Sequence, residues 1–99
     1  MGKTFIVNRI ELRKNLTLLG ISDVNINSLE AELNKRHRHI NAVAFAGLLQ
    51  KIGLRQDEII NLFRRIGIDD VKITEIMNVL DEEKINEAYG RVVELDISE

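Results

Sequence analysis

The residues of this chain that could do chemistry are few, and the densest group of them is basic. Lys35, Arg36, His37, Arg38 and His39 follow one another without interruption. Clustered Lys and Arg side chains release counterions when they contact the phosphates of nucleic acid, so this basic cluster predicts a phosphate-binding patch. The alternative is a solvated helix end, because cations near a helix C-terminus also complement the helix dipole.

The histidine, acidic and hydroxyl side chains form no recognisable metal-binding or catalytic motif. His37 and His39 are the only histidines, and the chain has no cysteine. A catalytic zinc ion requires three protein ligands, and the neighbouring Lys and Arg would repel a cation. The serines do not stand near a histidine in any pattern typical of a nucleophile and its base. We therefore expect no metal ion, no cofactor and no enzymatic activity.

Residues 48–63 resemble the helix-turn-helix DNA-binding motif. Gly53 stands between Ile52 and Leu54, as the tight turn of the motif requires, and apolar residues recur on the inner face of the second helix. The resemblance implies that duplex DNA is contacted from this hairpin. The implied contact residues are Arg55, Gln56, Asn61, Arg64 and Arg65.

Two features of this segment depart from the motif. Leu49 occupies the position, four residues before the glycine, where a small residue is usual. Asp57 and Glu58 begin the presumed recognition helix, where two carboxylates would repel phosphate. A plain helical hairpin with a glycine turn is therefore the alternative interpretation of the same residues.

An internal repeat relates two parts of the chain at a constant offset of 47 residues. Residues 11–33 and 58–80 share a helical pattern, the sequence Gly-Ile-x-Asp-Val-x-Ile and a second helical pattern. The Val and the last Ile of each linker are two residues apart, so they would point the same way in an extended segment. Two copies are too few for a solenoid. We therefore expect a closed pseudo-symmetric bundle, with a linking helix between the copies.

This helix–loop–helix repeat resembles a paired EF-hand, in architecture alone. An EF-hand loop needs acidic oxygens at alternate positions, a glycine at the sharp turn and an acid at the twelfth place. Residues 67–73 are too few and offer only the adjacent Asp69 and Asp70. The resemblance therefore implies a metal-free scaffold that grips a helix of a partner.

Glycines and capping residues divide the chain into helices. Gly20, Gly53 and Gly67 each follow an apolar residue and precede an aliphatic one, which is typical of helix C-termini. The residues predicted to cap helix N-termini are Asn8, Asn27 and Thr74. The expected helices span residues 9–19, 28–37, 41–52, 56–66 and 75–89, the last either continuous or broken at Asp81.

The two ends of the sequence favour β-structure. Residues 4–7 and 91–97 are β-leaning, and would either pair as one small ribbon or fray. The predicted fold is all-α, with at most this minor β ribbon from the termini, in a compact bundle of about five helices. The predicted single domain 1–99 contains repeat units 8–37 and 55–89, a linking helix 41–52, and termini 1–7 and 91–99 that are strand-like or frayed.

Composition and charge narrow the class of protein. A length of 99 residues fits one domain, and 44% hydrophobic with 30% charged residues is typical of a globular chain. The longest apolar run near the N-terminus is Phe5-Ile6-Val7, so we expect no signal-peptide core, no membrane association and a cytoplasmic location. Abundant isoleucine and many charged residues lean toward a thermophilic source.

The charges are unevenly placed along the chain. Residues 1–65 carry 11 basic and 6 acidic residues, a net charge of +5. Residues 66–99 carry 3 basic and 10 acidic residues, a net charge of −7. This separation predicts an anionic partner at one end and a cationic partner at the other, unless the charges are simply solvated.

The leading hypothesis from the sequence is a non-catalytic accessory protein in a nucleic-acid transaction, either transcription or replication. Its predicted contacts with duplex DNA are Lys35, Arg36, Arg38, Arg55, Gln56, Asn61, Arg64 and Arg65. The alternative is a metal-free, EF-hand-like protein-interaction adaptor or a small subunit of a larger complex. Leu18 and Ile60 lie off the main apolar stripes and are the predicted partner contacts, and a homodimer through the same residues is a third option.

Overall fold

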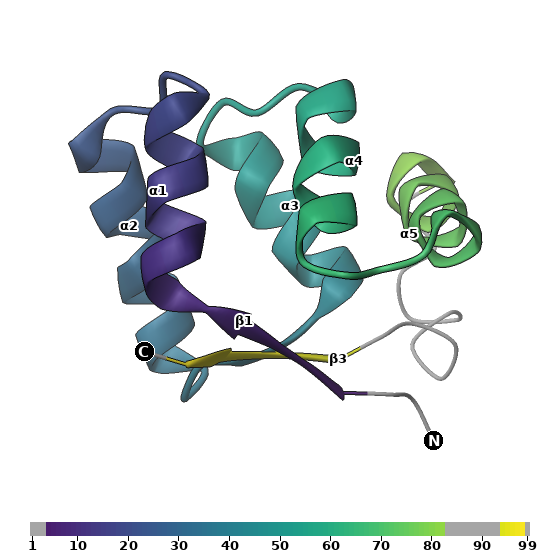
Figure 1. Cartoon of the computed structure of the whole chain (residues 1–99), viewed down its shortest axis with the longest axis horizontal. Coiled ribbons are helices and arrows are strands. Elements are labelled where there is room, and N and C mark those ends of the chain that lie inside the picture. The colour runs from purple at the N-terminus through teal and green to yellow at the C-terminus, as the bar shows by residue number, and fades with distance from the viewer. Residues whose placement is uncertain (1–3, 83–93, 99) are drawn as a thin grey trace.

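The computed structural model describes residues 4–82 and 94–98 (Figure 1). The elements, in chain order, are β1 (Thr4–Asn8), α1 (Arg9–Leu18), α2 (Asp23–Lys35), β2 (His39–Asn41), α3 (Ala42–Lys51), α4 (Gln56–Arg65), α5 (Asp70–Glu82) and β3 (Glu94–Ser98). This part of the chain is mostly helical, as predicted. It also contains a three-stranded sheet, which is more β-structure than the minor ribbon that the sequence predicted.

The sheet joins the two ends of the described chain. Its strand order is β1–β3–β2, with β1 parallel and β2 antiparallel to β3. Val7 pairs with Ile97, and Ile40 pairs with Leu95. All four of these side chains are buried, whereas Ile6 is exposed, so one face of the sheet packs on the helices. Of the two alternatives for the ends, a paired ribbon or frayed termini, the structure shows pairing of residues 4–8 with 94–98, and β2 is an addition that the sequence analysis missed.

α3 is the helix on which the other elements pack. Its buried residues are Ala42, Val43, Phe45, Ala46 and Leu49. In Figure 1, α3 lies behind α1 and α4, with α2 beyond it on one side and α5 on the other. The ring of Phe45 stacks against that of Phe63 in α4, with their centroids 6.1 Å apart. The predicted linking helix is thus at the centre of the molecule.

Three helices lie where the sequence predicted them. α1, α3 and α4 each begin at the predicted residue or one residue after it, and each ends one residue before the predicted end. The predicted cap at Asn8 is confirmed, because its side-chain oxygen accepts a hydrogen bond from the backbone N–H of Glu11 at 3.1 Å. α5 is described from Asp70 to Glu82, so the alternative of a break near Asp81 falls at the limit of the described residues. Residues 83–89 of the predicted last helix lie outside the described residues.

α2 begins five residues earlier than predicted. The cap is Ser22, whose hydroxyl accepts a hydrogen bond from the backbone N–H of Asn25 at 3.3 Å. The predicted cap, Asn27, lies inside the helix, where its side chain accepts a hydrogen bond from Arg13 at 2.6 Å. The prediction was wrong because Asn27 and Ser22 are both capable caps, and the local pattern does not choose between them.

α5 also begins five residues earlier than predicted. A carboxylate oxygen of Asp69 accepts a hydrogen bond from the backbone N–H of Lys72 at 2.9 Å, at the start of the helix. The predicted cap, Thr74, is therefore inside α5. The linkers of the repeat are not extended, because Val24 and Val71 stand in first helical turns, each 76% exposed.

The 47-residue offset of the sequence repeat also relates the bounds of the helices. Shifted by 47, both bounds of α1 coincide with those of α4, and the first residue of α2 coincides with the first residue of α5, which is described as far as Glu82. Gly20 and Gly67 end the first helix of each pair with positive φ angles of 88° and 95°. The two helix pairs therefore occupy equivalent stretches of sequence on either side of α3.

A group of charged side chains fixes α1 against α2. Glu30 accepts hydrogen bonds from Arg9 Nε at 3.1 Å and from Arg9 Nη2 at 3.0 Å. Arg13 Nη2 lies 3.7 Å from the same carboxylate. The hydrogen bonds from Arg9, and then the nearby charges of Arg9, Arg13 and Arg38, hold the pKa of Glu30 below its ordinary value although burial opposes them. This pairing sets the position of the α1 face that is described below.

Two glycines of neighbouring segments should respond in opposite ways to alanine. Gly53 has a φ of +110°, which strains an L-residue, so Gly53→Ala should lower the free energy of unfolding by about 1–2 kcal/mol. Gly47 lies inside α3, and an added Cβ would meet Leu80 Cδ1 at an ordinary 3.9 Å. Gly47→Ala should therefore raise the free energy of unfolding by about 0.5–1 kcal/mol through helix propensity. Urea unfolding followed by circular dichroism measures both; an equal response would contradict the turn at Gly53.

Candidate functional site: the groove between α1 and α4

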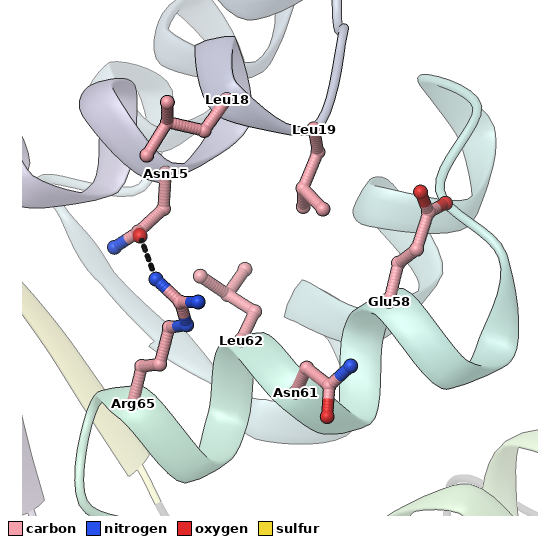
Figure 2. A pocket seen from close by; sticks show the side chains of 7 residues that line it. All are labelled: Asn15, Leu18, Leu19, Glu58, Asn61, Leu62 and Arg65. Atoms are coloured by element: carbon pink, nitrogen blue, oxygen red, sulfur yellow. Dashed lines mark hydrogen bonds between the residues drawn. The ribbon is translucent and has the colours of Figure 1, made fainter.

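A hollow of about 180 Å³ lies between the C-terminal half of α1 and the outer side of α4 (Figure 2). Its lining residues are Asn15, Leu18, Leu19, Glu58, Asn61, Leu62 and Arg65. A second, wider hollow of about 410 Å³ is lined by Glu11, Lys14, Asn15, Leu18, Arg65 and Ile66. The two share three residues and are together called the α1–α4 groove below.

One hydrogen bond crosses the α1–α4 groove. Arg65 Nη1 donates to the side-chain oxygen of Asn15 at 2.9 Å, from α4 to α1 (Figure 2). Both residues line both hollows, so this bridge lies where the hollows meet. It fixes the guanidinium of Arg65 in the groove, and because its acceptor is a neutral amide, this bond does not neutralise the charge of Arg65.

The apolar side of the groove is incompletely covered. Leu18 is 72% exposed and Leu19 is 36% exposed, whereas Leu62 beneath them is buried. Figure 2 shows Leu62 pointing from α4 toward α1 and Leu19 pointing back from the chain that follows α1. Burying a leucine side chain contributes about 1.5–3 kcal/mol, so covering Leu18 would be favourable. The groove thus offers an apolar contact with a buried leucine behind it.

Exposed aliphatic side chains concentrate on β1 and α1. Of the six large exposed ones among the described residues, Ile6, Ile10, Leu18 and Leu19 lie in or directly after these two elements. Ile10, Lys14 and Leu18 follow at intervals of four residues, so they form one stripe on the outer face of α1. This stripe runs along the edge of the α1–α4 groove.

The positions that line the groove come in pairs 47 residues apart. The pairs are Glu11 and Glu58, Lys14 and Asn61, Asn15 and Leu62, Leu18 and Arg65, and Leu19 and Ile66. The counterparts of the residues that line the first hollow are the residues that line the second hollow. The one exception is Leu62, the counterpart of Asn15, which lines the first hollow but not the second. The groove therefore lies where equivalent faces of the two helix pairs meet.

The structure places one of the two predicted partner contacts in the groove. Leu18 lines both hollows, as the protein-binding hypothesis requires of an exposed contact. Ile60 is partly buried against the core and does not line the groove. The sequence analysis missed Lys14 and Asn15, whose counterparts across the 47-residue offset, Asn61 and Leu62, line the groove with them.

The predicted DNA contacts on the second helix of the hairpin are exposed, but several are held by neighbouring groups. Arg64 Nε donates to a carboxylate oxygen of Asp70 at 2.8 Å, and Arg65 donates to Asn15. Arg55 lies 3.9 Å from Glu58, and its backbone N–H donates to the same carboxylate at 2.8 Å. The remaining predicted contacts on α4 are Gln56 and Asn61. The hairpin turn is present, and its cations are engaged within the molecule.

The basic cluster does not end a helix over residues 28–37 as predicted. Lys35 is the last residue of α2 and pairs with Glu32 at 3.4 Å. His37 and Arg38 then adopt left-handed φ angles of 55° and 60°, and the chain turns sharply into β2. Arg36 is exposed at this turn and makes no ion pair with a described residue.

The two groups of predicted DNA contacts lie on different sides of α1. In Figure 1, α1 lies between α2, which ends in the basic cluster, and α4. The backbone carbonyl of Arg38 accepts a hydrogen bond from the N–H of Ile97 at 2.6 Å, which fixes the cluster beside β3. The two groups therefore come from elements that lie on opposite sides of α1 in this view.

Acidic residues of the C-terminal part lie against the basic cluster. His39 Nδ1 is 3.0 Å from Asp96 Oδ1, and His39 Nε2 is 3.0 Å from Glu94 Oε2. The hydrogen bond with Asp96 is the largest of the effects that raise the pKa of His39, and both acids add to it by charge. The pairing of β2 with β3 thus brings two acids of the C-terminal part against one member of the basic cluster.

The stability of the sheet should depend on the protonation of His39. Because its pKa is raised in the folded state, the stabilisation is fully present below the unfolded pKa of about 6.5 and is lost as pH rises through the folded pKa. The wild-type urea midpoint should therefore fall more steeply between pH 6 and pH 9 than that of His39→Gln. His37→Gln is the matched control and should follow the wild type. Equal slopes for wild type and His39→Gln would contradict the pairing.

Comparisons with known proteins give no relative from which a function could be transferred. No family model, no curated protein and no solved structure matches the chain. Within the described ranges, no helix has the length and apolar character needed to span a membrane. Among the same residues, no group of three or more His, Cys, Asp or Glu side chains could hold a metal ion. The α1–α4 groove is therefore interpreted from its own geometry.

Proposed function

We propose that this protein is a non-catalytic protein-interaction module, an adaptor or a small subunit, that binds an apolar side chain of a protein partner in the α1–α4 groove. The observation that carries the proposal is the position of Leu18, which is 72% exposed at the edge of both hollows. Grooves between two helices commonly take the apolar face of a partner helix. This is the metal-free helix–loop–helix alternative of the sequence analysis.

The groove supports the proposal better than a hollow of similar size between α2 and α3. That hollow, of about 210 Å³, lies between α2 and α3 and is lined by Leu29, Leu48 and Ile52 together with polar residues. None of these three side chains belongs to the large exposed aliphatic residues of the described chain. A partner would gain little apolar burial there, whereas the α1–α4 groove presents Leu18 and Leu19.

We also propose that the two helix pairs are copies of one duplicated unit, with α3 as the link, in a protein that acts in the cytoplasm. The equal starts of the corresponding helices and the equal ends of α1 and α4 at an offset of 47 residues support the duplication, as do the paired positions that line the groove. In this proposal the groove arose at the contact between the copies and diverged from a symmetric lining.

A photo-crosslinking side chain at position 18 tests the proposed function. Placed at Leu18 in cells of the source organism, it should give crosslinked products with a defined protein. The matched control is position 24, because Val24 is exposed to a similar degree, at 76%, and lies outside the groove. A product of twice the chain mass of 11.3 kDa would assign the groove to a homodimer. The absence of products specific to position 18 would contradict the proposal.

A second candidate function is the nucleic-acid accessory role, and the turn after α2 is the observation that favours it. Lys35 and Arg36 are exposed there, and Arg38 follows in a left-handed conformation that keeps the turn tight. Cations on a tight, exposed turn can reach adjacent phosphates of a duplex. In this role the protein would bind duplex DNA without reading its sequence from the cluster.

The salt dependence of DNA binding tests this second candidate. For three phosphate contacts, affinity for a labelled duplex should fall about 40-fold between 50 and 200 mM salt, measured by fluorescence anisotropy. Reversing the charges of Lys35, Arg36 and Arg38 to Glu should flatten that dependence. Lys51→Glu, at an exposed position of α3, is the control and should leave most of the dependence in place. Absence of binding at 50 mM salt would remove the nucleic-acid role.

A further inference from the structure

We propose that the α1–α4 groove selects an amphipathic helix of a partner protein that carries an acidic side chain three or four residues from an apolar one. The apolar side chain would cover Leu18, and the acidic side chain would lie between Lys14 and Arg65. This inference rests on the proposed function, because it names the chemistry of the partner that the same groove binds.

The first step of the argument is the pair of cations in the wider hollow. Lys14 from α1 and Arg65 from α4 line it from opposite sides. Lys14 is exposed and forms no ion pair with any residue that the structure describes, and Arg65 donates its hydrogen bond to the uncharged amide of Asn15. An incoming carboxylate would find two cationic donors, one of them already fixed in position by a hydrogen bond.

The second step concerns the acidic residues that line the groove and the net charge that they leave in it. Glu58, in the smaller hollow, already accepts the backbone N–H of Arg55 at 2.8 Å at the start of α4. Glu11 is the one acidic residue lining the wider hollow, against the two cations Lys14 and Arg65. The wider hollow therefore carries a net positive charge, and charge complementarity favours an acidic side chain in it.

The third step is spacing. Lys14 and Leu18 are four residues apart on α1, so they lie one above the other on the same helix face. A partner helix that crosses this face can meet both with side chains separated by three or four residues. The acid would then enter the wider hollow while the apolar side chain rests between Leu18 and Leu19.

The fourth step is the difference between equivalent positions of the two helix pairs. Lys14 and Leu18 correspond, at the 47-residue offset, to Asn61 and Arg65. A groove with the same residues on both helices would accept a partner helix in either direction. In this groove the exposed leucine, Leu18, lies on α1, and its counterpart on α4 is Arg65. The apolar and acidic contacts therefore define one direction for the bound helix.

A phosphate polymer fits this groove less well than an acidic amphipathic helix. Glu11 and Glu58 line the groove and would repel a chain of phosphates. Such a ligand would bury no apolar surface of Leu18, Leu19 or Leu62. The observations therefore favour a protein partner at this surface.

Selection from a random helical peptide library displayed on phage tests the inference with the full chain. Wild-type protein should enrich peptides that pair an apolar residue with Asp or Glu three or four positions away. Leu18→Asp should not enrich them. Lys14→Glu should bind a wild-type-selected peptide about tenfold more weakly, and reversal of the acid in the peptide to Lys should restore binding to this variant. Lys51→Glu is the matched charge reversal outside the groove and should enrich the same peptides as the wild type.

The outcomes separate the inference from the function on which it rests. The enriched peptides could require Leu18 for binding, show no preference for acidic residues and bind Lys14→Glu with unchanged affinity. This result would overturn the inference but would still agree with the proposed function. Failure to enrich any peptide that depends on Leu18 would overturn both. Displacement of selected peptides by duplex DNA, with loss of DNA binding in Lys14→Glu, would assign these cations to phosphate and also overturn the inference. Circular dichroism and the urea midpoint of each variant verify folding, and Leu18→Ser replaces Leu18→Asp if the latter does not fold.

Discussion

The burial of α3 is the constraint on which the rest of the structure depends. This helix is apolar nearly all round, and a helix of that kind is stable in water only when other elements cover every side. β2 leads directly into it, and α4 and α5 pack on it, with Phe63 stacked on Phe45. The first helix pair completes the cover from the other side in Figure 1. The short sheet, by joining both ends of the described chain, closes the molecule around this core.

The α1–α4 groove follows from how the two helix pairs meet. α4 is held by α3 and α5, whereas α1 is held by β1 and by the pairing of Arg9 with Glu30 on α2. The hydrogen bond from Arg65 to Asn15 is a polar contact that spans α1 and α4. At the 47-residue offset, Asn15 corresponds to Leu62 and Arg65 corresponds to Leu18. These two leucines cannot form the hydrogen bond that Arg65 and Asn15 form, and Leu18 remains exposed.

The sequence predicted those helices whose ends are set by local chemistry. Asn8 and the glycine turns act on residues only a few positions away, so α1, α3 and α4 were predicted within one residue at either end. The starts of α2 and α5 were wrong because exposed Val24 and Val71 resemble core residues of an extended linker. β2 was missed because three residues beside a basic cluster carry no strand signal, and their partner lies more than fifty residues away on β3.

The candidate site was predictable to a smaller extent, since it depends on which helix faces which. Leu18 stood out because it lies off the apolar stripe of its helix, and the same reasoning selected Ile60, which packs against the core. Lys14 and Asn15 acquire their place only when α4 lies opposite α1. The 47-residue offset could have indicated these two residues. Each position that lines the groove has a counterpart 47 residues away that also lines it.

The distribution of charge in the fold argues for the groove over the basic cluster as the principal interaction surface. In the sequence, the cluster and the acidic C-terminal part are far apart, which suggested separate partners for each. In the structure, Glu94 and Asp96 lie on His39 of the basic cluster, and Asp70 lies on Arg64, which is one of the predicted DNA contacts. Lys14 makes no ion pair with a described residue, Arg65 is held by the neutral amide of Asn15, and both stand beside exposed Leu18. A surface that combines such cations with uncovered apolar area stands to gain more from a protein partner than a cluster of charges alone.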